Sequence, residues 1–579
     1  MGSKKIILVY DGRNCRLHWN TCVDYNIIAK KHADFARVYK KKGKSCMKKS
    51  IIFKRALGVM LAGIMLFTAG CTNSTISKNN DKGAGEIPKE LSVFISKVQT
   101  IGKDMTDFND VLGFQMMEEA TGCHVNWTLP PADGATEKFN LMIASGQYTD
   151  AIVYSWGSST VNAKEYAEDG VILPLSDMID ECMPNFKKWC DENPEFAKRI
   201  KARGDGEIYY IPFIRTDKKL NIFLGPQMRT DWLENLGLEE PTNAQELYEV
   251  LKAFKTQDPN GNGIADEIPM TGVSSHHSMG LCALLWMFNT ADEFYVDGNT
   301  VKFGALTDEF KEGLGYIAKL YKEGLIDPDY ILQDRTKMDG KMTNGTAGFM
   351  YSYQPTKISN LMAEKDPSFR LEGIKHFENS DGVRKCYLTN YADSVLSAGL
   401  AISSTNPDPK GTLKWLDWIY SEEGQMAMNF GREGDTYTMV DGEPKFTEKV
   451  LKNPDGLTVG EAFGRFSGVY STSDFPNLQD WRSYSQSLSP YGIAAIETWA
   501  DGVDISGILP TLTFKDGEEE LVKDVMIQVN TYVDEMIDKV IMGQESVEDW
   551  DKVVKAIKDM KVEEVVEIYQ NAYDRYRGL

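Results

Sequence analysis

The sequence predicts an α/β protein with at least two lobes. Its 579 residues exceed what one hydrophobic core usually supports, because domains generally contain about 100–200 residues. Hydrophobic residues make up 42% and charged residues 26%, as in ordinary globular proteins, so most of the chain is expected to fold. From Glu90 onward short apolar stretches alternate with amphipathic ones, which is typical of a parallel sheet connected by helices.

The first half of this alternation can be assigned element by element. Apolar residues at every second position indicate strands, and apolar residues three and four apart indicate helices. Strands are expected at ELSVFI (90–95), HVNWTL (124–129) and DAIVYSW (150–156). Helices are expected at VLGFQMMEEATG (111–122), KFNLMIASG (138–146) and AKEYAEDG (163–170).

Three later helices are also expected. One begins with the capping-box pattern Thr242-Asn243-Ala244-Gln245 and carries its apolar residues on one face. A second is LCALLWMF (281–288), and a third is KWLDWIY (414–420), whose two tryptophans have helical spacing and are expected in the core.

The charge of the chain is strongly negative after its first 71 residues. Those residues hold 15 of the 64 basic and 3 of the 85 acidic side chains, which leaves 49 basic and 82 acidic side chains beyond them. Such a body repels nucleic-acid phosphates and anionic lipids, so nucleic acid is excluded as a partner. It suits cations and neutral ligands.

Residues 47–71 have the features of a secretory signal peptide. A basic start (Lys48, Lys49, Lys54, Arg55) precedes an uncharged apolar run from Ala56 to Ala69, which is too short to span a bilayer. The run ends in TAGC and resembles the lipobox of bacterial lipoproteins, in which the cysteine is lipidated, although Thr68 stands where that family usually has Leu. We expect Cys71 to carry the lipid anchor on the outer face of the cytoplasmic membrane; the alternative is a buried helix that ends at an incidental cysteine.

The segments on either side of this signal have separate explanations. Residues 72–89 are polar and rich in Ser, Asn, Lys and Gly, as in a flexible tether. For residues 1–46 there are two expectations. Either translation begins at Met47 and these residues are not made, or they form an extension that is removed on export. The body holds five further cysteines in no recognisable pattern, so neither a disulfide framework nor a CxxC metal site is predicted.

The stretch DPNGNGIADE places oxygen donors at the spacing of a calcium-binding EF-hand loop. The candidate ligands are six: Asp258, Asn260, Asn262, the carbonyl of Ile264, Asp266 and Glu267. Pro269 occupies the twelfth position, where an EF-hand usually has a bidentate Glu, and Glu267 could replace it. The role would be structural; the alternative is a Gly- and Asn-rich turn with solvated carboxylates.

Several motifs occur in the order found in one family. LMIASGQYTDAIVYSW, EYAEDGVILPLSDMI, DGEIYYIPF, MRTDWLENLGLEEPTNAQEL, YKEGLIDPD, GTAGFMYSY and WIYSEEGQMAMNFGREGDTY resemble the extracellular solute-binding proteins of carbohydrate ABC transporters, closest to large lipoproteins of Gram-positive bacteria. Some proteins of this fold, alginate-binding ones included, carry a calcium loop of the form D-x-N-x-N-x-x-x-D-E.

This resemblance implies a fold, a function and partners. The fold is the type II periplasmic-binding-protein-like Venus flytrap, with one lobe from 90–214 and 392–470 and the other from 215–391 and 471–579. The chain is expected to cross between the lobes near 211–218, near 391–403 and after 424–437. A monomer would capture a carbohydrate, expected to be an oligosaccharide, and deliver it to the permease of an ABC importer.

Aromatic residues near strand ends are the candidate sugar contacts, because sugars pair apolar faces with hydroxyl groups. The candidates are Tyr154, Trp156, Trp286, Tyr351, Tyr353, Trp481 and Tyr484. Core packing is the alternative for each one. Arg432 and Glu433 could hydrogen-bond a ligand or form a salt-bridged loop.

No enzyme motif is present. The chain lacks HExxH, GxSxG, a P-loop and paired CxxC, so no catalytic residue is predicted. A glycoside hydrolase could still hide two carboxylates among the acidic residues, since such pairs have no fixed spacing. A ligand-sensing subunit for a membrane receptor is a third alternative.

Overall fold

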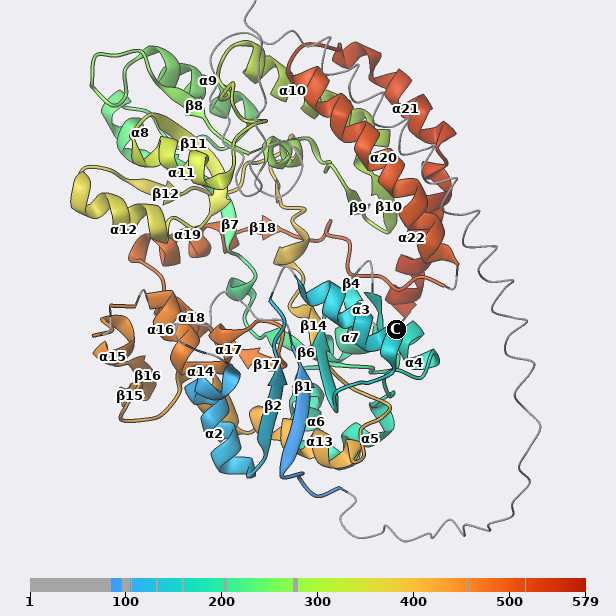
Figure 1. Cartoon of the computed structure of the whole chain (residues 1–579). Helices are drawn as coiled ribbons and strands as arrows, with labels where there is room; N and C mark the ends of the chain where they lie inside the picture. The colour runs from blue at the N-terminus through green and yellow to red at the C-terminus, as the bar shows by residue number, and fades with distance from the viewer. Residues whose placement is uncertain are drawn as a thin grey trace, which may run out of the picture. The chain divides into compact units, whose positions relative to one another are not determined.

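The computed structural model describes residues 85–578, apart from 96–104, 106, 132–133, 159–160, 203–205, 274–279, 455, 458 and 516 (Figure 1). Residues 80–579 form one compact unit. The predictions for the extension, the signal peptide, Cys71 and most of the tether lie outside the described residues. None of the described helices is both long and apolar enough to cross a bilayer.

A six-stranded sheet organises the first part of the body. Its strand order is β17-β6-β14-β3-β1-β2, and every pairing is parallel except the two that β14 makes. The strands are β1 (Glu90–Phe94), β2 (His124–Thr128), β3 (Ala151–Tyr154), β6 (Ile211–Arg215), β14 (Val395–Ile402) and β17 (Asn477–Gln479). The three strands expected between residues 90 and 156 are therefore confirmed.

Both faces of this sheet are buried, which explains its nearly continuous apolar strands. In β1, Val93 enters one core and Phe94 the other; in β3, Val153 and Ile152 divide in the same way. The helices that accompany this sheet in sequence are α2 (Leu112–Thr121), α3 (Ala135–Ser145), α4 (Ala163–Glu168), α5 (Ser176–Cys182), α6 (Pro184–Glu192), α7 (Pro194–Ala202), α13 (Pro409–Asp417), α14 (Glu422–Phe430), α15 (Glu448–Leu451), α16 (Val459–Phe466) and α17 (Gly468–Ser471). Trp415 is fully buried here, as its helical spacing predicted.

A four-stranded sheet organises the second part. Its order is β12-β7-β11-β8, with β7 antiparallel to both neighbours. The strands are β7 (Leu224–Arg229), β8 (Ile268–Met270), β11 (Ala347–Tyr353) and β12 (Leu371–Gly373). The accompanying helices are α8 (Thr230–Leu236), α9 (Ala244–Thr256), α10 (Asp308–Lys322), α11 (Arg335–Thr343), α12 (Thr356–Lys365), α18 (Trp481–Ser485), α19 (Pro490–Ala500), α20 (Glu518–Ile541), α21 (Trp550–Asp559) and α22 (Val562–Gly578).

Smaller ladders complete the second part. A hairpin joins β9 (Phe294–Asp297) to β10 (Thr300–Phe303), and β13 (Arg384–Lys385) pairs with β18 (Val503–Asp504). Helix α19 packs on β7 and β12, where the Trp499 ring donates Nε1–H to the carbonyl of Pro226 at 2.9 Å. The core of this part is the larger of the two.

Three linkers connect the two sheets within the described residues. The first (216–223) joins β6 to β7, and the second (386–394) joins β13 to β14. The third (480–489), which includes the short helix α18, joins β17 to α19. Asn221 Nδ2 of the first linker donates to Ser394 Oγ of the second at 2.7 Å. Thr216 Oγ1 of the first linker donates to the carbonyl of Gln479, the last residue of β17, at 2.7 Å. This repeated crossing agrees with a two-lobe fold, while the expected residue boundaries of the lobes stay a prediction.

Two local predictions were wrong. Asn243, rather than Thr242, caps α9, because its side chain accepts from the backbone N–H groups of both Gln245 and Glu246. Residues 281–288 form a 3₁₀ helix (η4, Leu281–Phe288) rather than an α-helix. All of η4 except Phe288 is buried, so tertiary packing sets its pitch.

Candidate ligand site

A column of four side chains runs along the first linker. The Arg215 guanidinium lies 5.4 Å from the Phe223 ring centroid, and the Phe223 and Tyr353 rings stack at 5.7 Å and 13°. The Arg335 guanidinium lies 4.2 Å from the Tyr353 centroid. We call these four residues the linker stack. Cation–π and ring–ring contacts of this kind hold two charged groups in fixed positions.

The linker stack joins both sheets. Arg215 is the last residue of β6, Phe223 precedes β7, Tyr353 ends β11, and Arg335 begins α11. Strand ends and linkers are where two-lobe α/β proteins place ligands. The stack is therefore the first part of the candidate site.

Aromatic residues of the third linker lie beside it. Trp481 is 6.0 Å from Tyr484 between ring centroids, and the Lys219 ammonium lies 5.3 Å from the Trp481 ring. Burial raises the pKa of Tyr484, whereas the positive charge of Arg215 opposes that rise. Both rings are half-buried, so each keeps surface for a ligand.

A cavity of about 620 Å³ lies between elements of the two sheets. Its lining includes Trp156, which follows β3, Asn162, which caps α4, and Thr389 from the second linker. Residues 509–514 and side chains of α20 and α22 complete it. Beside the cavity a hydrogen bond joins the two parts of the structure, in which Asn162 Nδ2 donates to Glu519 Oε2 of α20 at 3.2 Å.

Tyr154 and Trp156, two predicted contacts, are brought together at this end of β3. Tyr154 is half-buried and stacks on Phe139 at 3.9 Å and 4°. Trp156 is 0% exposed to solvent, and its Nε1–H donates to the carbonyl of Ile152 at 3.1 Å. Trp156 thus closes the floor of the cavity from a fixed orientation.

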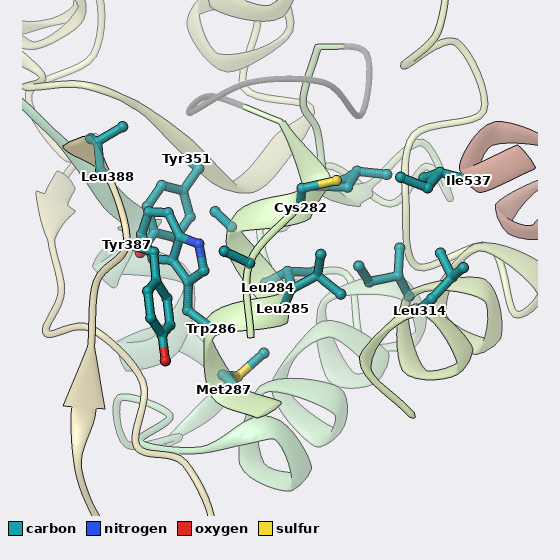
Figure 2. Close-up of a cluster of buried hydrophobic side chains, with 14 of the residues drawn as sticks. Cys282, Leu284, Leu285, Trp286, Met287, Leu314, Tyr351, Tyr387, Leu388 and Ile537 are labelled. Atoms are coloured by element: carbon teal, nitrogen blue, oxygen red, sulfur yellow. The ribbon is translucent and has the colours of Figure 1, made fainter. Parts of the chain in front are cut away.

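Trp286 and Tyr351 also lie together, but inside the core of the second sheet. Figure 2 shows the two rings side by side, and their centroids are 5.5 Å apart at 83°. Their exposed fractions are 6% and 2%. Tyr351 Oη contacts Nδ1 of the buried His376 at 2.7 Å. This burial favours the core-packing alternative for both residues.

The acidic loop at 258–267 has its side-chain oxygens turned inward. Asp258 accepts from the N–H groups of Asn262 and Gly263 at 3.1 and 3.0 Å, and Asn262 Oδ1 accepts from the N–H of Ile264 at 2.6 Å. Asp258, Gly261 and Gly263 have φ values of 49°, 68° and 74°, which permits this tight curl.

The loop is anchored at the ends of β8 and β11 that lie away from the linkers. Asn260 Nδ2 donates to the carbonyl of Gly345 at 3.4 Å, and Asn235 Nδ2 donates to that of Pro259 at 3.0 Å. Glu267 Oε1 is buried without a hydrogen-bond partner, and burial raises the pKa of this carboxyl. Among the described residues no three His, Cys, Asp or Glu side chains surround a common point, so amide and carbonyl oxygens would have to complete a metal site.

Arg432 has a structural contact. Its Nη2 donates to both carboxylate oxygens of Glu119 at 2.9 and 2.8 Å and ties the loop after α14 to α2. Of the two possibilities for this loop, a hydrogen bond to a ligand or a salt bridge, Arg432 forms the salt bridge.

Sequence reasoning missed Arg215, Phe223 and Arg335. The signal was present in IPFIRTDKK, where a lone arginine follows four buried residues at the first expected crossing. A charge at the end of an apolar strand, directly before a linker, indicates a functional position.

A family model described as bacterial extracellular solute-binding protein matches residues 100–426, which is more than half of the chain. The chain belongs to the bacterial extracellular solute-binding proteins. The family is an extracellular one, and its members bind solutes.

Relatives in this solute-binding family share sequence and fold with the chain. The fructooligosaccharide ABC transporter substrate-binding protein FusA of Streptococcus pneumoniae is 35% identical over 341 residues, covering 57% of this chain and 61% of FusA. Lipoprotein LipO of Bacillus subtilis is 26% identical over 431 residues, covering 73% of this chain and 80% of LipO.

Solved structures agree. FusA in complex with kestose matches with a TM-score of 0.66 and 25% identity over 84% of this chain and 99% of that one. An EF-hand mutant of FusA with fructo-nystose gives a TM-score of 0.64 at 25% identity over 84% and 99%. The alginate-binding protein AlgQ2 without calcium gives 0.62 at 25% identity over 85% and 100%. The type II two-lobe fold expected from the sequence is therefore confirmed.

Proposed function

We propose that this solute-binding protein captures an oligosaccharide outside the cell and delivers it, unchanged, to the permease of an ABC importer. The observation that carries the proposal is the 35% identity with FusA, a fructooligosaccharide-binding protein of an ABC transporter. The linkers support it, because rings and polar groups alternate there as sugar binding requires. The protein acts as a monomer and catalyses no reaction.

Calorimetric titration with a panel of oligosaccharides tests this function. The panel contains kestose, nystose, trigalacturonate and alginate trimers, and each mixture is then analysed by chromatography. We expect saturable binding of at least one of these sugars, with no cleavage product. Cleaved products would identify an enzyme, and a panel in which no sugar binds would refute carbohydrate capture.

The ligand contacts that we propose are Tyr353, Trp481 and Tyr484 at the linkers, with Tyr154 and Trp156 at the end of β3. Their support is position: each lies at a strand end or linker, and all but Trp156 keep exposed surface. Trp156 would act through the wall of the cavity that it lines. Trp286 and Tyr351 would act indirectly, by packing in the core of the second sheet next to the site.

We further propose that the acidic loop holds a structural calcium ion through Asp258, Asn260, Asn262, Ile264, Asp266 and Glu267. The Glu267 Oε1 atom, buried without a hydrogen-bond partner, supports this, because a cation would stabilise the ionised form of that carboxyl. The FusA structure with an EF-hand mutation indicates that a relative has such a loop. The ion would supply no chemistry to a ligand and would fix the turn between α9 and β8.

Thermal unfolding with calcium and with chelator tests this site. A ligand that binds only the folded state stabilises it by about 2.7 kcal/mol at a hundredfold excess over Kd. We expect calcium to raise the unfolding midpoint of the wild type but not of the double variant Asp258→Ala, Asp266→Ala. Glu364→Ala, an exposed carboxylate on α12, is the control and should keep the calcium response. An unchanged midpoint in the wild type would contradict the proposal.

The protein would be held at the membrane by a lipid on Cys71. The support is the order of basic residues, apolar run and TAGC at 48–71.

A further inference from the structure

The two arginines of the linker stack differ from five other arginines of the described structure in their contacts with carboxylates. Arg229, Arg370, Arg384, Arg432 and Arg482 each donate a hydrogen bond to a carboxylate. The Arg215 guanidinium donates none to any described residue; the Phe223 ring lies against it, and Asp393 supplies a nearby negative charge. Arg335 has a buried Nε without a hydrogen bond, and its nearest carboxylate oxygen, on Asp339, is 3.7 Å away.

This arrangement is unexpected in so acidic a protein. The chain has 85 carboxylate side chains against 64 basic ones, so a guanidinium could easily find a partner. Burial lowers the pKa of Arg215, and the negative charge of Asp393 only partly offsets that effect. A desolvated cation without a bonded anion is costly, and an incoming anion would recover part of that cost.

The neighbouring carboxylates already serve other groups. Asp339 lies 3.7 Å from Lys357 as well as from Arg335, and Lys219 pairs with Glu497 at 3.1 Å. The Arg215 guanidinium and Arg335 Nε therefore have no hydrogen bond to a carboxylate among the described residues, although Asp393 and Asp339 lie near them. The planar fork of a guanidinium matches a carboxylate in two parallel hydrogen bonds.

The rings hold these donors in place on two different elements. Phe223 and Tyr353 lie between the two guanidinium groups, with successive separations of 5.4, 5.7 and 4.2 Å, so a ligand that binds both arginines has to carry an anionic group for each. We propose that the linker stack selects an acidic oligosaccharide, whose uronate carboxylates bind Arg215 and Arg335. This inference rests on the proposed function and names the ligand class of the same site.

Calorimetric titration with a matched pair of sugars tests the inference. Trigalacturonate carries three carboxylates, whereas its fully methyl-esterified form is neutral and otherwise alike. We expect trigalacturonate to bind the wild type and Arg215→Gln to weaken it about ten- to hundredfold, the range for hydrogen bonds to charged groups. Arg335→Gln should weaken it similarly. Arg432→Gln, which removes an arginine outside the linkers, should leave Kd unchanged.

Binding of the neutral ester separates recognition from folding. Residual affinity for the ester should be the same in wild type, Arg215→Gln and Arg335→Gln, since a purely structural role would lower affinity for both sugars. The inference is overturned if kestose binds and trigalacturonate does not, which leaves carbohydrate capture intact. It is also overturned if trigalacturonate binds equally to all variants. A protein that binds none of the panel sugars overturns both proposals.

Discussion

At the scale of single residues, His376 shows how burial fixes a protonation state. Its Nδ1 lies 2.7 Å from Tyr351 Oη and its Nε2 3.3 Å from Tyr391 Oη. Tyr391 donates its own proton to the carbonyl of Leu224, so it accepts from Nε2–H of the histidine. Tyr351 then donates to Nδ1. The imidazole is neutral and joins β7, β11 and the second linker.

This neutral histidine makes stability depend on pH. Burial lowers the pKa of His376 from 6.5 to about 3. Between these two pH values the imidazole is protonated in the unfolded chain but neutral in the folded one. Its stabilising contribution is complete above pH 6.5 and is lost as pH falls toward 3. Across that window the loss is about 1.4 kcal/mol per pH unit.

Urea unfolding of wild type and His376→Gln measures this contribution, since glutamine keeps a donor and an acceptor but does not titrate. We expect the difference in unfolding free energy between the two proteins to shrink steadily from about pH 6 to about pH 4. His124→Gln, at an exposed histidine, controls for the loss of an imidazole. A difference that stays constant with pH would show that His376 does not titrate on unfolding.

At the scale of elements, the close packing of α19 on β7 fixes the position where the third linker ends. Gly225 in β7 lies under Trp499, and a Cβ added there would come within 2.4 Å of the indole ring. The indole is fully buried and bonded to Pro226, so it has no room to move. The approach therefore requires glycine at this position.

Two identical substitutions should have opposite effects. Gly225→Ala overpacks the contact and should destabilise the fold by about 1–3 kcal/mol. Gly340→Ala lies inside α11 with nothing within 4 Å of its new Cβ, so it should stabilise by about 0.5–1 kcal/mol through helix propensity. Thermal unfolding midpoints measure both. Equal shifts of the same sign would mean that α19 does not pack tightly on β7.

At the scale of the whole molecule, the folded body and the proposed lipid anchor should contribute separately to ligand binding and to location. Residues 80–579 form a compact unit, and the proposed lipid site lies before it in sequence. Cys71→Ser should therefore leave ligand affinity unchanged and move the protein from the membrane fraction into the medium. Fractionation with immunoblotting measures this distribution. Protein that stays in the membrane fraction would rule out lipidation of Cys71 as the anchor.

Sequence patterns predicted the fold better than the site. The spacing of apolar residues predicted the main strands and helices from Glu90 to Glu168, because that spacing differs between a strand and a helix. The 3₁₀ pitch of η4 could not be predicted, because burial on every side removes the periodic signal. The linker stack depends on contacts between residues such as Arg215 and Arg335, which are 120 positions apart in the numbering. No local pattern reveals that proximity, whereas the residues of the proposed calcium loop are contiguous, so the sequence alone suggests that loop.

The position of β14 has a consequence for biogenesis. This strand, residues 395–402, fills the middle of the first sheet between β3 and β6. A chain that emerges amino end first must therefore hold β3 with an open edge until some 250 further residues have appeared. Such an edge invites pairing with other chains. Helper proteins at the export site, and a pause before the body is released, would protect it during that interval.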